Sequence, residues 1–117
     1  MSVLDQSFSS TNRLTKPSDF TEVFKSSKRL TDGNFVILFR PNGLAVARLG
    51  IAISRKSVRL ASTRNRLKRI IREGFRRHKD DLKGLDIVVV AKRSINTANH
   101  SIIASSLSAQ WKKLKSA

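Results

Sequence analysis

The stretch from Ser62 to Arg77, STRNRLKRIIREGFRR, decides the fold that the rest of the chain must complete. On a helix, at about 100° per residue, its apolar residues share one side. This apolar side consists of Leu67, Ile70, Ile71, Gly74 and Phe75. The opposite side consists of Asn65, Arg69, Arg72 and Arg76. The pattern predicts a helix with one face against a core and the other turned toward anions.

The whole chain is strongly basic. It has 117 residues, with 24 Lys or Arg against 8 Asp or Glu, and a formal net charge of +16. A small domain this basic is typical of proteins that bind nucleic acid or an anionic membrane surface. Like charges four residues apart on a helix cost about 0.2–0.5 kcal/mol per pair. A polyanionic partner would explain why the basic row on residues 62–77 is kept.

Length and composition indicate one domain. A chain of this size buries roughly two thirds of its unfolded surface without disulfides. We expect residues 1–12 to be a flexible N-terminal segment and residues 13–117 to form a single α/β domain. The chain has no Cys, which excludes disulfides, thiolate zinc sites and cysteine nucleophiles. No apolar stretch is of membrane-spanning length, so we expect a cytoplasmic protein without a membrane partner.

The N-terminal half predicts one helix and two or three strands. Pro17 suits the first position of a helix, in which Phe20 and Phe24 share one face. The runs Asn34–Arg40 and Arg48–Ser54 are rich in residues that favour strands. Because a short loop joins these two strands, we expect them to pair as an antiparallel hairpin.

The strand predicted at residues 48–54 has one face of small residues. Gly50 and Ala52 lie on this face, opposite the larger Leu49, Ile51 and Ile53. Such a face leaves room either for the close approach of another element or for a ligand in a groove. The sequence alone does not decide between the two.

The C-terminal half predicts a central strand and another helix. Asp86–Ala91, DIVVVA, is apolar on both faces and should lie in the middle of a sheet. Ser101–Lys115 has the apolar spacing of an amphipathic helix, with Trp111 as a core anchor. The elements predict an α+β fold in the order α-β-β-β-α-β-α, with a mixed central sheet packed by helices.

Residues Thr63–Glu73, TRNRLKRIIRE, closely resemble the signature of the protein subunit of bacterial ribonuclease P. This ribonucleoprotein endonuclease removes the 5′ leader from precursor tRNA. The resemblance implies a left-handed β-α-β crossover, as in the second domain of a ribosomal protein, where the general rule expects a right-handed one. It also implies that the RNA subunit is catalytic and binds Mg²⁺, with one protein per RNA. The protein would then need no cofactor and no small-molecule substrate.

The resemblance also implies roles for individual residues. Contacts to RNA phosphates and riboses are implied for Arg64, Asn65, Arg66, Lys68, Arg69 and Arg72. A cleft for the single-stranded 5′ leader of precursor tRNA is implied for Phe20, Phe24, Val36, Leu38 and Lys56. Aromatic faces stack on bases of any sequence, which suits a leader that differs between precursors. The protein would thereby raise the affinity for substrate and lower the Mg²⁺ requirement.

The residues themselves offer no active site. His78 and His100 are far apart in sequence, and the eight acids are scattered, so we predict neither a catalytic nor a metal site. The main alternative is a ribosomal or other structural RNA-binding protein without a role in cleavage. A DNA-binding regulator lacks a helix-turn-helix pattern, because residues 48–54 read as a strand. An autonomous nuclease would need catalytic groups that the sequence does not provide.

Overall fold

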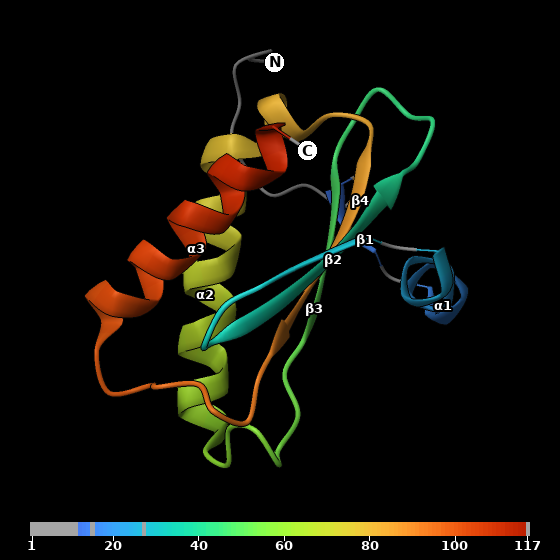
Figure 1. Ribbon diagram of the computed structural model, residues 1–117. Helices are drawn as coiled ribbons and strands as arrows, with labels where there is room; N and C mark the ends of the chain where they lie inside the picture. Colours follow the sequence, from blue (N-terminus) through green and yellow to red (C-terminus); the bar gives the residue numbers. More distant parts are fainter. Residues whose placement is uncertain (1–11, 15, 27, 117) are drawn as a thin grey trace, which may run out of the picture.

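The computed structural model describes residues 12–14, 16–26 and 28–116 (Figure 1). Its helices are α1 (Pro17–Ser26), α2 (Ala61–His78) and α3 (His100–Ser116), and a short 3-10 helix, Lys79–Leu82, follows α2. Its strands are β1 (Lys28–Thr31), β2 (Phe35–Pro41), β3 (Arg48–Ala52) and β4 (Leu85–Ala91). The predicted element order is confirmed. None of the helices described is long and apolar enough to cross a membrane.

The four strands form one mixed sheet in the order β1-β2-β4-β3. Strand β4 pairs antiparallel with β2 and parallel with β3. The predicted hairpin between residues 34–40 and 48–54 is therefore wrong, because β4 lies between these two strands. The physical reason is burial: β2 and β4 are the most apolar strands, and pairing them in the middle of the sheet covers both. The central position predicted for Asp86–Ala91 is confirmed.

The sheet carries helices on both faces (Figure 1). Helices α2 and α3 cover one face, and α1 lies against the other. The larger core lies under α2 and α3 and includes Phe35, Ile37 and Phe39 of β2. A smaller core lies under α1 and includes Leu38 and Val88 from the sheet. Alternate residues of β2 thus point to opposite faces, as the strand period requires.

The N-terminal boundary of the fold differs from the prediction at one residue. Most of the segment 1–12 lies outside the described residues. Asn12, however, is buried, and its Nδ2 donates a hydrogen bond to the carbonyl of Ala47 over 2.8 Å. Arg13 then forms a parallel bridge with Leu49 of β3. Asn12 therefore belongs to the folded part, because the edge of β3 takes up the chain there.

Helix α2 has the bounds and the buried face that its sequence predicts. Its core residues are Leu67, Ile70, Ile71 and Phe75, and three of them are completely inaccessible to solvent. Trp111 of α3 is also buried, as expected for a core anchor, and its ring meets that of Phe75 at a centroid distance of 6.2 Å. The basic row is thus fixed to a helix that is anchored along its full length.

Gly74 allows α2 and α3 to approach each other. A Cβ atom at this position would lie 2.6 Å from Nε1 of Trp111, well inside van der Waals contact. Glycine in a helix costs about 0.5–1 kcal/mol relative to alanine. The close seating of the indole explains why this cost is accepted here.

We expect Gly74→Ala to destabilise the protein by about 1–2 kcal/mol, although alanine is the better helix former. Overpacking of a filled core costs about 1–3 kcal/mol, which exceeds the gain in helix propensity. Urea unfolding measures the difference. Gly33→Ala is the matched control, because nothing lies within 4 Å of a Cβ at Gly33. A variant at Gly74 as stable as wild type would contradict the tight contact with Trp111.

A buried carboxylate joins β4 to three other parts of the fold. Asp86 is completely buried, and its oxygens accept hydrogen bonds from Nε and Nη2 of Arg48 over 2.8 and 2.7 Å. Asn42 donates a third hydrogen bond over 3.0 Å, and Nη2 of Arg40 lies 3.6 Å away. Arg48 also reaches Asp19 of α1, at 3.8 Å. The network fixes α1 relative to the sheet.

Candidate nucleic-acid interface

The exposed face of α2 carries a row of cationic and amide side chains. Asn65, Arg69 and Arg72 are exposed, and Lys68 is half-buried beside them. In the part of the chain that the structure describes, none of these four side chains makes a hydrogen bond or an ion pair. Cations held on a rigid helix without internal partners are free to bind phosphates, Arg as a bidentate fork and Lys as a point charge.

The C-terminal end of the row is partly neutralised. Glu73 pairs with Arg76, and its Oε1 lies 3.4 Å from Nε of Arg77. The hydrogen bond from Arg76 lowers the pKa of the Glu73 carboxyl below its ordinary value. The excess positive charge of α2 is therefore greatest in its N-terminal and middle turns.

Two of the predicted RNA contacts also hold the protein together. Nη1 of Arg64 donates hydrogen bonds to the carbonyls of Val58 and Arg59, both over 2.9 Å. Nη2 of Arg66 donates to the carbonyl of Thr97 in the loop before α3. Both side chains are half-buried. Each guanidinium therefore positions a neighbouring segment of the chain and has further N–H groups beyond these hydrogen bonds.

Of the residues predicted for a leader cleft, Phe20, Val36 and Leu38 pack in the smaller core on the opposite face of the sheet. The ring of Phe20 packs over Gly50 so closely that a Cβ there would lie 2.6 Å from the ring carbons. This decides the open question about the small residues of β3: at Gly50 the space is filled by α1. Phe24, one helical turn further on, is 50% exposed. Its aromatic face is available to a partner.

The two predicted strand residues of that cleft differ in accessibility. Leu38 is only 3% exposed and belongs to the core under α1. Val36 is half-buried and packs at the margin of the same core. Val36 is therefore the more accessible of the two, and Leu38 packs in the core beneath α1.

Lys56 is exposed in the turn between β3 and α2. Close to it in sequence, Ser54 and Ser57 line a hollow of about 440 Å³ at the carboxyl ends of β3 and β4. Lys68 of α2 also lines this hollow. Lys68 therefore connects this hollow with the basic row of α2, and only the two serines hinted at the hollow from sequence.

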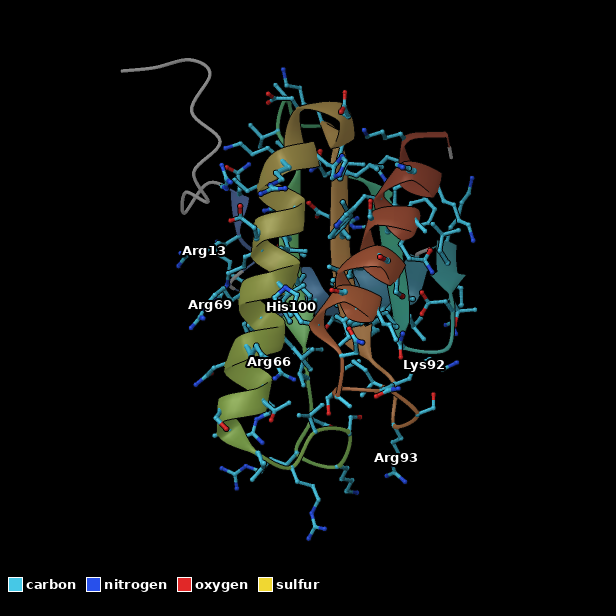
Figure 2. The ribbon with its side chains drawn as sticks, turned by 90° about the vertical axis from the view of Figure 1, so that its left-hand side faces the viewer. Arg13, Arg66, Arg69, Lys92, Arg93 and His100 are labelled. Atoms are coloured by element: carbon cyan, nitrogen blue, oxygen red, sulfur yellow. The ribbon has the colours of Figure 1, made fainter. Side chains whose placement is uncertain are left out.

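A second groove lies between α2 and α3, on the side of the molecule that Figure 2 presents. Figure 2 shows Arg66 and Arg69 on α2 with His100 between the two helices. His78 also lines this groove, so both histidines border the same surface feature. Burial, followed by the charge of Lys115, lowers the pKa of His78 below its ordinary value. The small residues Ala104 and Ser108, which also line the groove, were the signal that the sequence offered.

The described part of the chain contains no cluster of possible metal ligands. Within residues 12–14, 16–26 and 28–116, no three His, Cys, Asp or Glu side chains come together in a group that would hold a metal ion. The chemistry that these surfaces do offer is the binding of anions and of flat aromatic groups.

Comparison with known sequences matches this chain to a protein family. A family model described as ribonuclease P matches residues 8–115. The chain is 39% identical over 111 residues to the ribonuclease P protein component of Thioalkalivibrio sulfidiphilus, covering 95% of this chain and 92% of that protein. It is 42% identical over 113 residues to that of Pseudomonas putida, covering 96% and 84%.

Comparison with solved structures agrees. A Staphylococcus aureus RNase P protein mutant with defective mRNA degradation activity superposes with a TM-score of 0.79 at 32% identity, covering 90% of this chain and 89% of that chain. The RNase P protein from Thermotoga maritima gives a TM-score of 0.62 at 37% identity, covering 89% and 88%. The similarity therefore extends over nearly the whole described fold.

Proposed function

The chain belongs to the family of ribonuclease P protein components, and we propose that its part in tRNA 5′ maturation is to bind RNA rather than to cut it. In this proposal the catalytic RNA of ribonuclease P carries out cleavage and holds the Mg²⁺ ions. The protein binds that RNA and the 5′ leader of the precursor. The observation that carries the proposal is the row Lys68, Arg69 and Arg72, which has no internal partner among the described residues.

The basic row favours the catalytic RNA as its partner. Every phosphate contact releases counterions, so a row of exposed cations supplies affinity that does not depend on sequence. Arg66, through its bond to the Thr97 carbonyl, fixes the loop before α3 against the same helix. The row is thus a rigid surface that needs little reordering when a structured RNA docks.

The α1 face favours the single-stranded leader. Phe24 is exposed, and Phe20 is half-buried beside Val36 on the same side of the sheet. Bases of a single strand stack on such rings, and each stacked base contributes about 1–3 kcal/mol. A leader bound here distinguishes precursor from mature tRNA, because only the precursor has it. Affinity that the product lacks also favours product release.

Reconstitution tests this function. The purified chain is mixed with a bacterial ribonuclease P RNA at low Mg²⁺, and 5′ cleavage of a precursor tRNA is compared with that of RNA alone and protein alone. We expect strong stimulation in the mixture only. Cleavage by the protein alone would overturn the non-catalytic role. Binding without stimulation would favour a structural RNA-binding protein instead.

We expect Phe24→Ala to weaken binding of precursor tRNA by the reconstituted enzyme by about fivefold to 100-fold, the loss of one stacked base. Phe20→Ala should act in the same direction. Affinity for mature tRNA and for the catalytic RNA should stay near wild type. Filter binding with precursor and mature tRNA measures the difference.

The exposure of Phe24 makes its variant the cleaner of the two. Phe20 also packs on Gly50, so its truncation loosens α1, whereas half of the Phe24 surface is already in water. Equal losses for precursor and mature tRNA would rule out a leader contact at Phe24.

A further inference from the structure

Helix α1 is too short to be stable by itself, so the sheet must determine where it lies. It has ten residues, and isolated helices shorter than about 12–15 residues are marginal in water. Helices α2 and α3 share one face of the sheet, whereas α1 is the only described helix on the other (Figure 1). The position of α1 therefore depends on the side chains that join it to the sheet.

One of these contacts is a gap in β3. Gly50 lies under the ring of Phe20, where a Cβ atom would come within 2.6 Å of two ring carbons. The same Cβ would lie 3.3 Å from Cβ of Leu14, which precedes α1. Gly50 thus sets how closely α1 approaches the sheet.

The second contact is an ion pair to the residue before Phe20. Nη1 of Arg48 lies 3.8 Å from a carboxylate oxygen of Asp19, and both side chains are half-buried. Arg48 is already oriented, because its Nε and Nη2 donate hydrogen bonds to the buried carboxylate of Asp86. Ordering two long side chains usually cancels much of the value of such a pair, but here one side chain is held in advance.

We propose that Arg48 and Gly50 are positioning residues for recognition of the precursor leader. They lie on the same face of β3 and hold two consecutive residues of α1. They thereby fix the place of Phe24, one helical turn beyond Phe20 and 50% exposed. A binding group must be held within about 0.5 Å of its productive position by the residues around it. This inference rests on the proposed function, because it specifies how the leader site is prepared for its substrate.

The two cores of the fold make this role separable from a general role in stability. No residue of α1 that the structure describes belongs to the core under α2 and α3. The basic row lies on α2, across the sheet from α1 (Figure 1). A displaced α1 should therefore weaken binding of the leader and leave the surface for the catalytic RNA unchanged.

The first test removes the ion pair to Arg48. We expect Asp19→Asn to weaken binding of precursor tRNA by the reconstituted enzyme about twofold to fivefold, the value of a partly exposed ion pair. Affinity for mature tRNA and for the catalytic RNA, and the urea midpoint, should stay near wild type. Asp19→Glu keeps the charge and should restore most of the affinity for precursor.

The control for Asp19 removes the same charge from the same helix. Glu22 is exposed on α1. Because the loss of a negative charge by itself favours RNA binding, Glu22→Gln should bind precursor at least as tightly as wild type does. Equal precursor affinities of Asp19→Asn and Glu22→Gln would show that the pair to Arg48 has no positioning role.

The second test fills the gap under Phe20. We expect Gly50→Ala to weaken precursor binding by up to about tenfold, since a displaced helix loses part of the stacking of one base. Gly33→Ala is the control, because nothing lies within 4 Å of a Cβ at Gly33. A precursor affinity of Gly50→Ala equal to that of Gly33→Ala would overturn the role of Gly50.

A third measurement needs no RNA. The chain has no Cys, so nitroxide labels can be attached through Ser18→Cys on α1 and Ser105→Cys on α3, both at exposed positions. Double electron–electron resonance measures the distance between the labels across the sheet. We expect a broader distribution of distances in Asp19→Asn and a longer mean distance in Gly50→Ala than in the labelled wild type. Unchanged distances in both variants would overturn the proposal.

These measurements separate this inference from the proposed function. If wild type stimulates cleavage but both variants keep the wild-type affinity for precursor and the wild-type label distances, Arg48 and Gly50 do not position α1 and the subunit role stands. If wild type fails to stimulate cleavage while the label distances change as expected, the two residues hold α1 and the subunit role falls.

Discussion

Asp86→Asn is expected to lower the free energy of unfolding by about 3–5 kcal/mol, the usual cost of removing one partner from a buried ion pair. The substitution keeps the volume of the side chain but replaces an acceptor by an amide NH₂. Arg48 then faces a donor where it had two hydrogen bonds. Since small domains are stable by only about 5–15 kcal/mol, this change removes a large share of the total. Urea unfolding at pH 7 measures it.

The same substitution should alter the dependence of stability on pH. Burial on its own would raise the pKa of Asp86, but the hydrogen bonds from Arg48 and Asn42 and the charges of Arg48 and Arg40 together lower it below its ordinary value. Because the folded pKa lies below the unfolded value of about 3.9, the stabilisation is present above roughly pH 4. It is lost as the pH falls through the lowered folded pKa. The difference between wild type and Asp86→Asn should therefore shrink in acid.

Asp81→Asn is the matched control for this prediction. Asp81 pairs with Lys115 over 3.1 Å, but its side chain is 60% exposed. Exposed ion pairs contribute about 0–1 kcal/mol, so this variant should unfold almost as wild type does. Equal effects at the two positions would show that the network around Asp86 does not stabilise the fold.

Replacing both Arg69 and Arg72 by Ala is expected to weaken binding of ribonuclease P RNA by about 100-fold to 10,000-fold. A hydrogen bond to a charged group contributes about 1.5–3 kcal/mol net, and two are lost. The slope of log K against log salt should also become shallower, by about 0.7 to 0.9 for each contact. Both arginines are exposed and lie outside the core, so the urea midpoint should not fall.

The control for Arg69 and Arg72 removes the same charge from another surface. Lys112 and Lys113 are exposed on α3, outside the basic row. Replacing both by Ala lowers the net charge equally but should leave most of the affinity and the slope in place. If the two double variants lose affinity equally, binding follows total charge and the row on α2 has no special role.

Local pattern was enough to predict the helices and the side that each strand turns toward the core. In α2 the apolar and basic residues repeat with the helical period, and the helix Ala61–His78 extends only one residue beyond each end of the predicted stretch Ser62–Arg77. The alternation of β2 placed Phe35, Ile37 and Phe39 together, and they share one core.

The sequence pattern did not predict which elements lie next to one another in the fold. Alternation shows which face of a strand is buried but not which strand lies beside it, so β2 and β3 were wrongly paired. Strand β1, with the sequence KRLT, has one partly buried apolar residue at an exposed edge and left little signal of its own. Gly74 is unfavourable for a helix on its own, and its role follows only from the packing of Trp111 against it. Each of these features depends on contacts between residues distant in sequence.

The position of β4 determines when this protein can fold during its synthesis. The two strands that flank β4 are complete by residue 52, yet neither has its inner neighbour until residues 85–91 have left the ribosome. Until then the apolar strand β2 has one unpaired edge, and Arg48 lacks Asp86. Pairing between distant segments slows folding, and unpaired apolar edges promote aggregation. The chain must therefore wait for most of its length before the sheet can close, which makes newly made protein dependent on fast completion or on chaperones.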